Sequence, residues 1–177
     1  MVEEFPDELV TRLSEIAATT LEEGFLVSLS SGEPSRVEPW TPGNEVTIKL
    51  DFEGGRVAGW VSVDTTLAFL SNLWNVLMED DGQLALSDAQ DFAGEIVNQV
   101  VGRLKTHLLE LDASLGIKLS TPDIFDLQSA VKRPTVLVPL SDEGGELHVI
   151  YCFKLLDWPQ LSESEGATEE LVVGEGS

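Results

Sequence analysis

Helical periodicity dominates the first part of the chain. Apolar residues recur three and four positions apart from Leu9 to Leu21, the spacing that places side chains on one face of a helix. Pro6 suits a first helical turn, and the two acidic residues after it suit the positive end of a helix. The pattern therefore predicts a helix from Pro6 to about Gly24. The next residues, FLVSL at 25–29, predict a strand.

Strict alternation follows further along. Every second residue from Val46 to Phe52 is apolar and the residues between are polar, which is typical of a half-buried strand. A second strand is expected over 56–63 (RVAGWVSV). The Gly54-Gly55 pair between the two strands would supply the positive φ of a tight hairpin turn. Residues 30–44 are rich in Pro, Ser and Gly and predict a loop.

Two more helices are expected in the middle of the chain. Residues 65–79 show leucines at helical spacing and end in the acidic stretch MEDDG. A long helix is expected over about 87–111, with Ser87 as its cap and Gln90 completing a capping box. After Gly116 the sequence predicts strands near 117–121, 134–140 and 146–155, the last two joined through Gly144-Gly145.

The order of these elements repeats. Residues 6–64 and 87–155 each read helix, strand, loop, strand, Gly-Gly turn, strand. This repetition predicts an α+β fold of two pseudo-symmetric α-β-β-β halves. They would form a sheet of about six strands with long helices packed over one face. Residues 5–156 are expected to form one domain, and residues 157–177, which contain no Lys or Arg, an acidic, disordered tail.

Charge then restricts the partners. The chain has 10 Lys and Arg against 32 Asp and Glu, a formal net charge of −22. Binding to DNA, RNA or an anionic membrane needs a basic footprint, so these partners are excluded. A basic patch on a protein would be attracted, although the charge also suits solubility or a salty cytoplasm. The acidic N-terminus does not resemble a signal peptide, and no apolar run approaches the roughly 20 residues of a membrane span, so we expect a cytoplasmic protein.

One face of the long predicted helix is polar. Asp91, Glu95, Asn98 and Gly102 are spaced four, three and four residues apart, and Lys105 continues the row. At about 100° per residue these positions share one outward stripe. A solvated face is the ordinary explanation, but Asn is a poor residue inside a helix and Gly costs roughly 1 kcal/mol against Ala there. A face that admits another protein closely would use both.

Other candidates for chemistry are weak. His107 and His148 have no partner at ligand spacing, and no Ser-His-Asp order, phosphate loop or metal-ligand pair is present in the sequence. The single Cys152 allows no disulfide within the chain and no cysteine metal site. Asp80 and Asp81 are expected to form an acidic loop. Core or interface positions are expected for the four tryptophans, Trp40, Trp60, Trp74 and Trp158.

The stripe carries a resemblance to a known family. The segment DAQDFAGEIVNQVVGRLKTHL resembles the signature helix of the chemotaxis phosphatases CheC and CheX. That signature has Asp or Ser, Glu four positions on, Asn three further, and Pro a fixed distance later. Asp91, Glu95 and Asn98 match it in register, and Pro122 in LSTPDIF stands one residue beyond the expected distance.

The resemblance implies a function. Members of this family dephosphorylate the response regulator CheY, whose phosphoryl group is on an aspartate with Mg²⁺ alongside. Asn98 would enter the regulator's active site and hold the attacking water, because a carboxamide both accepts and donates hydrogen bonds. Glu95 would pair with a regulator lysine, since an exposed carboxylate is a poor base at pH 7. Asp91, Gly102, Lys105 and Pro122 would take part in docking. The partner would supply Mg²⁺, and the chain would need no cofactor of its own.

The resemblance is closer to the CheX branch. CheC-type chains carry a second such helix, but here the first helix keeps only Glu15, with Thr11 and Ala18 at the other two positions. A single catalytic site is therefore expected, and the CheX branch implies a homodimer formed through the sheets. The alternative is a non-enzymatic CheC-like module that binds a receiver domain or a flagellar switch component. A third interpretation is an unrelated acidic domain with a coincidental Glu-x-x-Asn.

Overall fold

Eight strands form one antiparallel sheet in the computed structural model, which describes residues 5–126 and 133–155. The long strands make two hairpins, and the four other strands are short. The first hairpin joins β3 (Val46–Glu53) to β4 (Val57–Thr65), and the second joins β7 (Thr135–Asp142) to β8 (Gly145–Leu155). β4 and β8 pair along their length at the centre of the sheet. The short strands are β1 (Ser30–Ser31), β2 (Ser35–Val37), β5 (Lys118–Leu119) and β6 (Asp123–Ile124).

The pairing of the short strands links the two halves. β1 and β2 belong to the first half but pair with β7, whereas β5 and β6 belong to the second half but pair with β3. Each half of the chain thus adds short strands to the edge of the hairpin that the other half forms. The predicted α+β fold of two α-β-β-β halves is confirmed. The expected number of about six strands was too low, because strands of two or three residues leave no alternation to detect.

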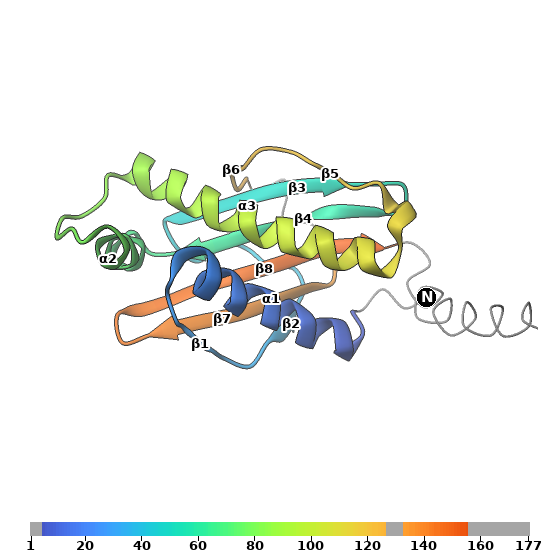
Figure 1. Cartoon of the computed structure of the whole chain (residues 1–177), viewed down its shortest axis with the longest axis horizontal. Helices are drawn as coiled ribbons and strands as arrows, with labels where there is room; N and C mark the ends of the chain where they lie inside the picture. Colours follow the sequence, from blue (N-terminus) through green and yellow to red (C-terminus); the bar gives the residue numbers. More distant parts are fainter. Residues whose placement is uncertain (1–4, 127–132, 156–177) are drawn as a thin grey trace, which may run out of the picture.

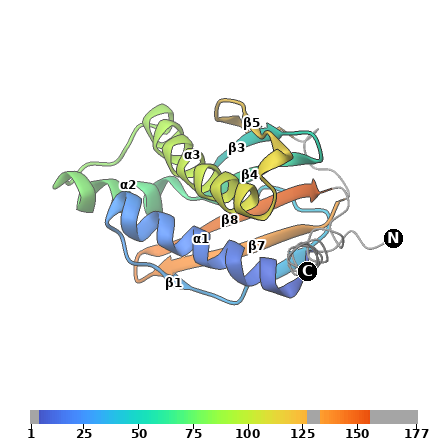
Figure 2. The same ribbon diagram turned by 45° about the vertical axis from the view of Figure 1, so that its right-hand side comes forward.

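Three helices cover one face of the sheet in the described ranges (Figure 1). α1 (Asp7–Phe25) and α3 (Leu86–Leu111) lie side by side, α3 over β3 and β4 and α1 beside β7, while α2 (Leu67–Met78) lies at one end (Figure 2). Alternate residues of the strands pack under them. Tyr151 of β8 is fully buried, which raises its pKa, and its hydroxyl donates to the Leu13 carbonyl of α1 at 2.8 Å. None of the described helices is both long enough and apolar enough to span a bilayer.

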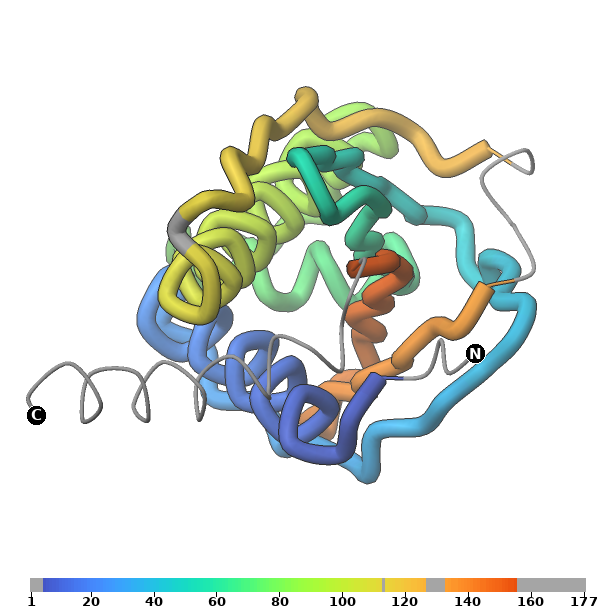
Figure 3. The backbone as a smooth tube through the Cα atoms, turned by 90° about the vertical axis from the view of Figure 1, so that its right-hand side faces the viewer, coloured from blue at the N-terminus to red at the C-terminus, as the bar shows by residue number. Residues whose placement is uncertain are grey.

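The opposite face of the sheet has its own aromatic cluster. Trp60 of β4 points away from the helices and contacts Trp40 and Phe125, with ring centroids 5.9 and 5.0 Å away. The connection over residues 38–45 crosses this face (Figure 3). The buried Asp64 carboxylate holds it by accepting hydrogen bonds from Asn44 and from the Thr47 hydroxyl at 2.7 Å. The prediction of core tryptophans is confirmed for Trp40 and Trp60, and Trp158 lies outside the described residues.

Cys152 belongs to the same cluster and is buried. Burial raises the pKa of its thiol, mainly because an apolar environment disfavours the thiolate. Cys152 therefore packs as a small apolar residue within this cluster.

The predicted strand over 25–29 is wrong. Phe25 ends α1 as a buried residue and packs edge-on against Phe92 of α3, with centroids 5.7 Å apart. Leu26 follows in the left-handed region at φ 55°, and the Val27 amide returns to the Leu21 carbonyl at 3.1 Å. This is a helix C-cap, and β1 begins only at Ser30. The region 30–44 also contains β1 and β2, so it is not purely a loop.

Two smaller predictions, one about a helix cap and one about a turn, are also wrong. The long helix begins at Leu86 after Ala85, with no side-chain cap, so Ser87 lies within the helix and makes no capping box. Neither Gly54 nor Gly55 has a positive φ. Gly54 is required for a different reason, since a Cβ at that position would lie 2.4 Å from the Leu115 carbonyl oxygen.

Candidate functional site

α3 presents its polar row outward. Asp91, Glu95 and Asn98 are exposed, and Ile96 and Val97 beside them are fully buried under the helix. The sharp change between exposed and buried positions fixes the rotation of α3 on the sheet. The three polar side chains therefore stand on a backbone that the core holds in place.

Gly102 and Lys105 continue the row and are half-buried. A Cβ at Gly102 would have no atom within 4 Å beyond its own neighbours. The missing side chain leaves free space, which opens on a hollow of about 610 Å³ between α1 and α3, lined in part by Arg12, Gln99 and Gly102. Gly102 thus leaves the helix surface open at this point, and its part in docking a partner stays a prediction.

Pro122 lies against the same stretch of α3. A Cβ built on Gly94 would be 3.3 Å from the Pro122 Cβ, so proline and helix are in close contact. Gly94 is one turn from both Asp91 and Asn98 along the helix. The fold therefore brings Pro122 beside the polar row although it stands one residue beyond the family spacing. Sequence reasoning did not single out Gly94. A glycine inside a long helix, at an otherwise buried position, was the available signal.

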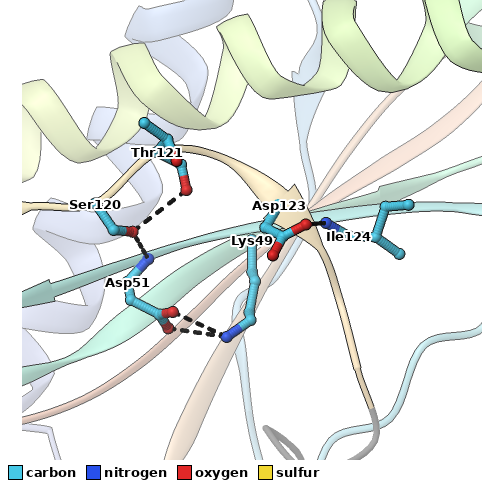
Figure 4. Close-up of polar contacts among 6 residues, drawn as sticks. All are labelled: Lys49, Asp51, Ser120, Thr121, Asp123 and Ile124. Carbon is cyan, nitrogen blue, oxygen red and sulfur yellow. Dashed lines mark hydrogen bonds and ion pairs between the residues drawn. The ribbon is translucent and has the colours of Figure 1, made fainter.

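Strand β3 fastens the segment that carries Pro122 (Figure 4). The Asp51 amide donates to the Ser120 hydroxyl at 3.0 Å, and the Ser120 amide donates to the Asp51 carbonyl at 2.9 Å. Beyond the proline, β6 pairs with β3, and the backbone of Asp123 lies opposite the backbone of Lys49. Lys49 in turn forms an ion pair with the Asp51 carboxylate at 2.9 Å. Anchors on both sides of Pro122 hold it against α3.

Gly102→Ala and Gly94→Ala form a matched pair on one helix. Because Ala is the better helix former and position 102 has room, we expect Gly102→Ala to raise the free energy of unfolding by up to about 1 kcal/mol. The gain should be smaller for Gly94→Ala, because the added methyl meets Pro122. Urea denaturation of both variants measures the difference. Equal stabilisation would show that Pro122 does not constrain the helix at Gly94.

α1 lacks an equivalent polar row. Glu15 is exposed, but Arg12 pairs with it at 3.2 Å, and Ala18 has no polar side-chain atom with which to position a water. Thr11 is exposed. A single catalytic site on α3 remains the prediction.

Each of the two histidines lies beside a glutamate close to it in the sequence. His148 pairs with Glu146 of its own strand, and His107 Nδ1 lies 3.9 Å from a Glu110 carboxylate oxygen. Among the described residues, no group of three or more His, Cys, Asp or Glu side chains is arranged to hold a metal ion.

Solved structures resemble this fold. CheX from Vibrio vulnificus matches with a TM-score of 0.67 at 18% identity, covering 83% of this chain and 99% of that one. A CheC-like superfamily protein from Shewanella sp. PV-4 matches with a TM-score of 0.67 at 17% identity, covering 85% and 99%. CheX in a CheX–CheY–BeF3–Mg²⁺ complex from Borrelia burgdorferi matches with a TM-score of 0.65 at 15% identity, covering 82% and 97%. At such identities the likeness shows the fold.

Sequence comparison identifies the family. No curated protein sequence matches the chain. The family model described as "Chemotaxis phosphatase CheX" matches residues 46–140, which is more than half of the chain. The matched region contains all of α3, with its polar row, and the segment that carries Pro122. The chain therefore belongs to the CheX family of chemotaxis phosphatases.

Proposed function

We propose that this protein removes the phosphoryl group from the aspartyl phosphate of a CheY-like receiver domain. The observation that carries this proposal is the exposure of Asn98 and Glu95 on the outer face of α3, whose other face is buried in the core. The family supports it, since its model is that of a chemotaxis phosphatase. A CheX protein of similar fold occurs in a complex with CheY, BeF3 and Mg²⁺.

Asn98 would act on the attacking water. Its carboxamide oxygen accepts a hydrogen bond from the water and its NH₂ group donates one, so it can hold the water in line with the phosphorus. The water oxygen bonds to phosphorus and loses a proton to solvent. The bond between phosphorus and the aspartyl oxygen breaks, which leaves a carboxylate and inorganic phosphate. Mg²⁺ bound to the receiver would neutralise the oxygens of the phosphoryl group.

Rigidity is the contribution of the fold to this step. A carboxamide that must hold a water in line works only if its backbone does not move. Ile96 and Val97 fix α3 from below, and Pro122, held by the anchors on β3, fixes it from the side. We infer that these contacts hold the backbone of Asn98 in a fixed position, so that its carboxamide projects from α3 to a constant place.

Glu95 would orient the partner. Its carboxylate is exposed one turn before Asn98, where a lysine of the receiver can pair with it. Asp91, Gly102, Lys105 and Pro122 border the same face and would contact the receiver around it. The net charge of −22 would favour encounter with a basic surface.

The test is a direct assay. Receiver domains of the source organism are phosphorylated with a small phosphodonor in Mg²⁺, the donor is removed, and phosphate loss is followed with and without the protein. At least one receiver should lose phosphate faster when the protein is present. If a receiver binds but keeps its phosphate for the same time, the protein is a non-catalytic interaction module.

A further inference from the structure

A second hollow borders the polar row at the start of α3. It has a volume of about 660 Å³ and lies between the end of α1, the last turns of α2 and the first turns of α3. These three segments meet at one end of the molecule (Figure 1). Trp74, Leu77 and Phe92 form an apolar floor, and the rings of Trp74 and Phe92 meet edge to face with centroids 5.4 Å apart.

The rim of this hollow is acidic. Asp80, Asp88, Asp91 and Glu95 line it, all four are exposed, and the described residues that line it include no Lys, Arg or His. Asp91 and Glu95 also belong to the polar row of α3. The hollow is therefore continuous with the proposed site.

Hydrogen bonds hold in place the connection between α2 and α3, which forms one wall of the hollow. The Leu84 amide donates to the Ser71 hydroxyl of α2 at 3.0 Å, and the Asn75 side-chain amide donates to the Gly82 carbonyl at 2.8 Å. The connection is thus tied to α2 at two points. These two bonds fix the position of the connection, whose residues Gln83, Leu84 and Ala85 line the hollow.

We propose that this hollow receives a lysine or arginine side chain of the receiver domain, together with an apolar neighbour, and selects which receivers the protein accepts. A long basic side chain matches both surfaces, because its apolar stem covers Trp74 and Phe92 while its cationic head meets Asp80 and Asp88. A purely apolar group would bury the rim carboxylates without a partner. The inference deepens the proposed function and rests on it for the identity of the partner.

Two variants test the occupation of the hollow. Ala85 lines it and is exposed, so Ala85→Trp fills it without removing a core side chain. Asp80→Lys with Asp88→Lys reverses the charge at two of the four acidic rim positions and cancels the net negative charge of the rim. The probe is the receiver domain that binds the wild-type protein most tightly, loaded with beryllofluoride and Mg²⁺. Each variant should raise its dissociation constant by about fivefold or more, with the rate of phosphate loss at saturation unchanged.

Matched controls separate the hollow from general effects. Ala68→Trp adds the same ring at an exposed position of α2 that does not line the hollow. Glu8→Lys with Glu53→Lys changes the net charge equally, and Glu8, like Asp88, lies in the first turn of a helix. Both controls should bind as the wild type does, and circular dichroism verifies the fold of all four proteins.

The outcomes distinguish this inference from the proposed function. If both hollow variants bind like wild type while the wild type dephosphorylates the receiver, the hollow is not used and the proposed function stands. If the receiver binds the wild type without losing phosphate, and both hollow variants bind it more weakly, the hollow is a docking site and the proposed function is wrong. Binding of no receiver at all would overturn both.

Discussion

Asn98→Ala is expected to lower the rate at which a bound receiver loses phosphate by at least about tenfold. Loss of about 1.4 kcal/mol of transition-state positioning is enough for that decrease. The fold should remain intact, because Asn98 is exposed and its truncation opens no cavity in the core. Ala is also the better helix former, so the free energy of unfolding should be unchanged or slightly higher.

A second substitution sharpens this prediction. Asn98→Asp keeps the shape of the side chain, removes the NH₂ donor and adds negative charge next to the phosphoryl group. It should be at least as inactive as Asn98→Ala. The matched control is Asn72→Ala, which removes an exposed amide from α2 and should leave the rate unchanged.

The measurement is phosphate loss at saturating protein, with binding followed separately. If Asn98→Ala keeps full activity, α3 is a docking face at most. The catalytic proposal would then be replaced by the interaction module.

The sequence predicted those features that depend on one helix or strand alone. The exposure of Asp91, Glu95 and Asn98 follows from helical periodicity, because the apolar residues between them determine which way α3 faces. Alternation predicted the strand from Val46 to Phe52, which matches β3 closely, and the strand expected over 146–155 matches β8. These features need only the sequence of one element and the knowledge that it has a buried side.

Contacts between distant segments could not be predicted in this way. Leu26 ends α1 because Phe25 packs on Phe92. The sequence FLVSL has the pattern of a strand and does not indicate this contact. The short strand β5 exists because the edge of β3 is available to it. The approach of Pro122 to Gly94 depends on the same edge.

The acidic hollow is the clearest case of this limit. Its floor combines Trp74 of α2 with Phe92 of α3, and Phe25 of α1 closes one side. In the sequence, Trp74 and Phe92 each belong to the apolar face of a helix, and Phe25 begins a predicted strand. Only the packing of three helices leaves a space among them, so the sequence predicted an acidic loop at Asp80 and Asp81 and no hollow beside it.

Glu95→Lys is expected to weaken binding of the receiver by about thirtyfold, with much smaller effects on the rate once the complex has formed. The substitution replaces an attraction to a receiver lysine by a repulsion. A pair of charges about 4 Å apart is worth about 1 kcal/mol in bulk water and more where water is partly excluded. Reversal therefore changes the binding free energy by about 2 kcal/mol, which corresponds to that factor.

Glu15→Lys is the matched control on α1. It makes the same change in net charge at an exposed glutamate, and it breaks only a surface ion pair with Arg12, which contributes at most about 1 kcal/mol to stability. Receiver binding should stay close to wild type for this variant. Titration of both variants at low and high salt gives a further criterion, because salt should reduce the deficit of Glu95→Lys by screening the repulsion. If Glu95→Lys instead binds normally and is inactive even at saturation, Glu95 acts in the chemical step and the proposed ion pair is wrong.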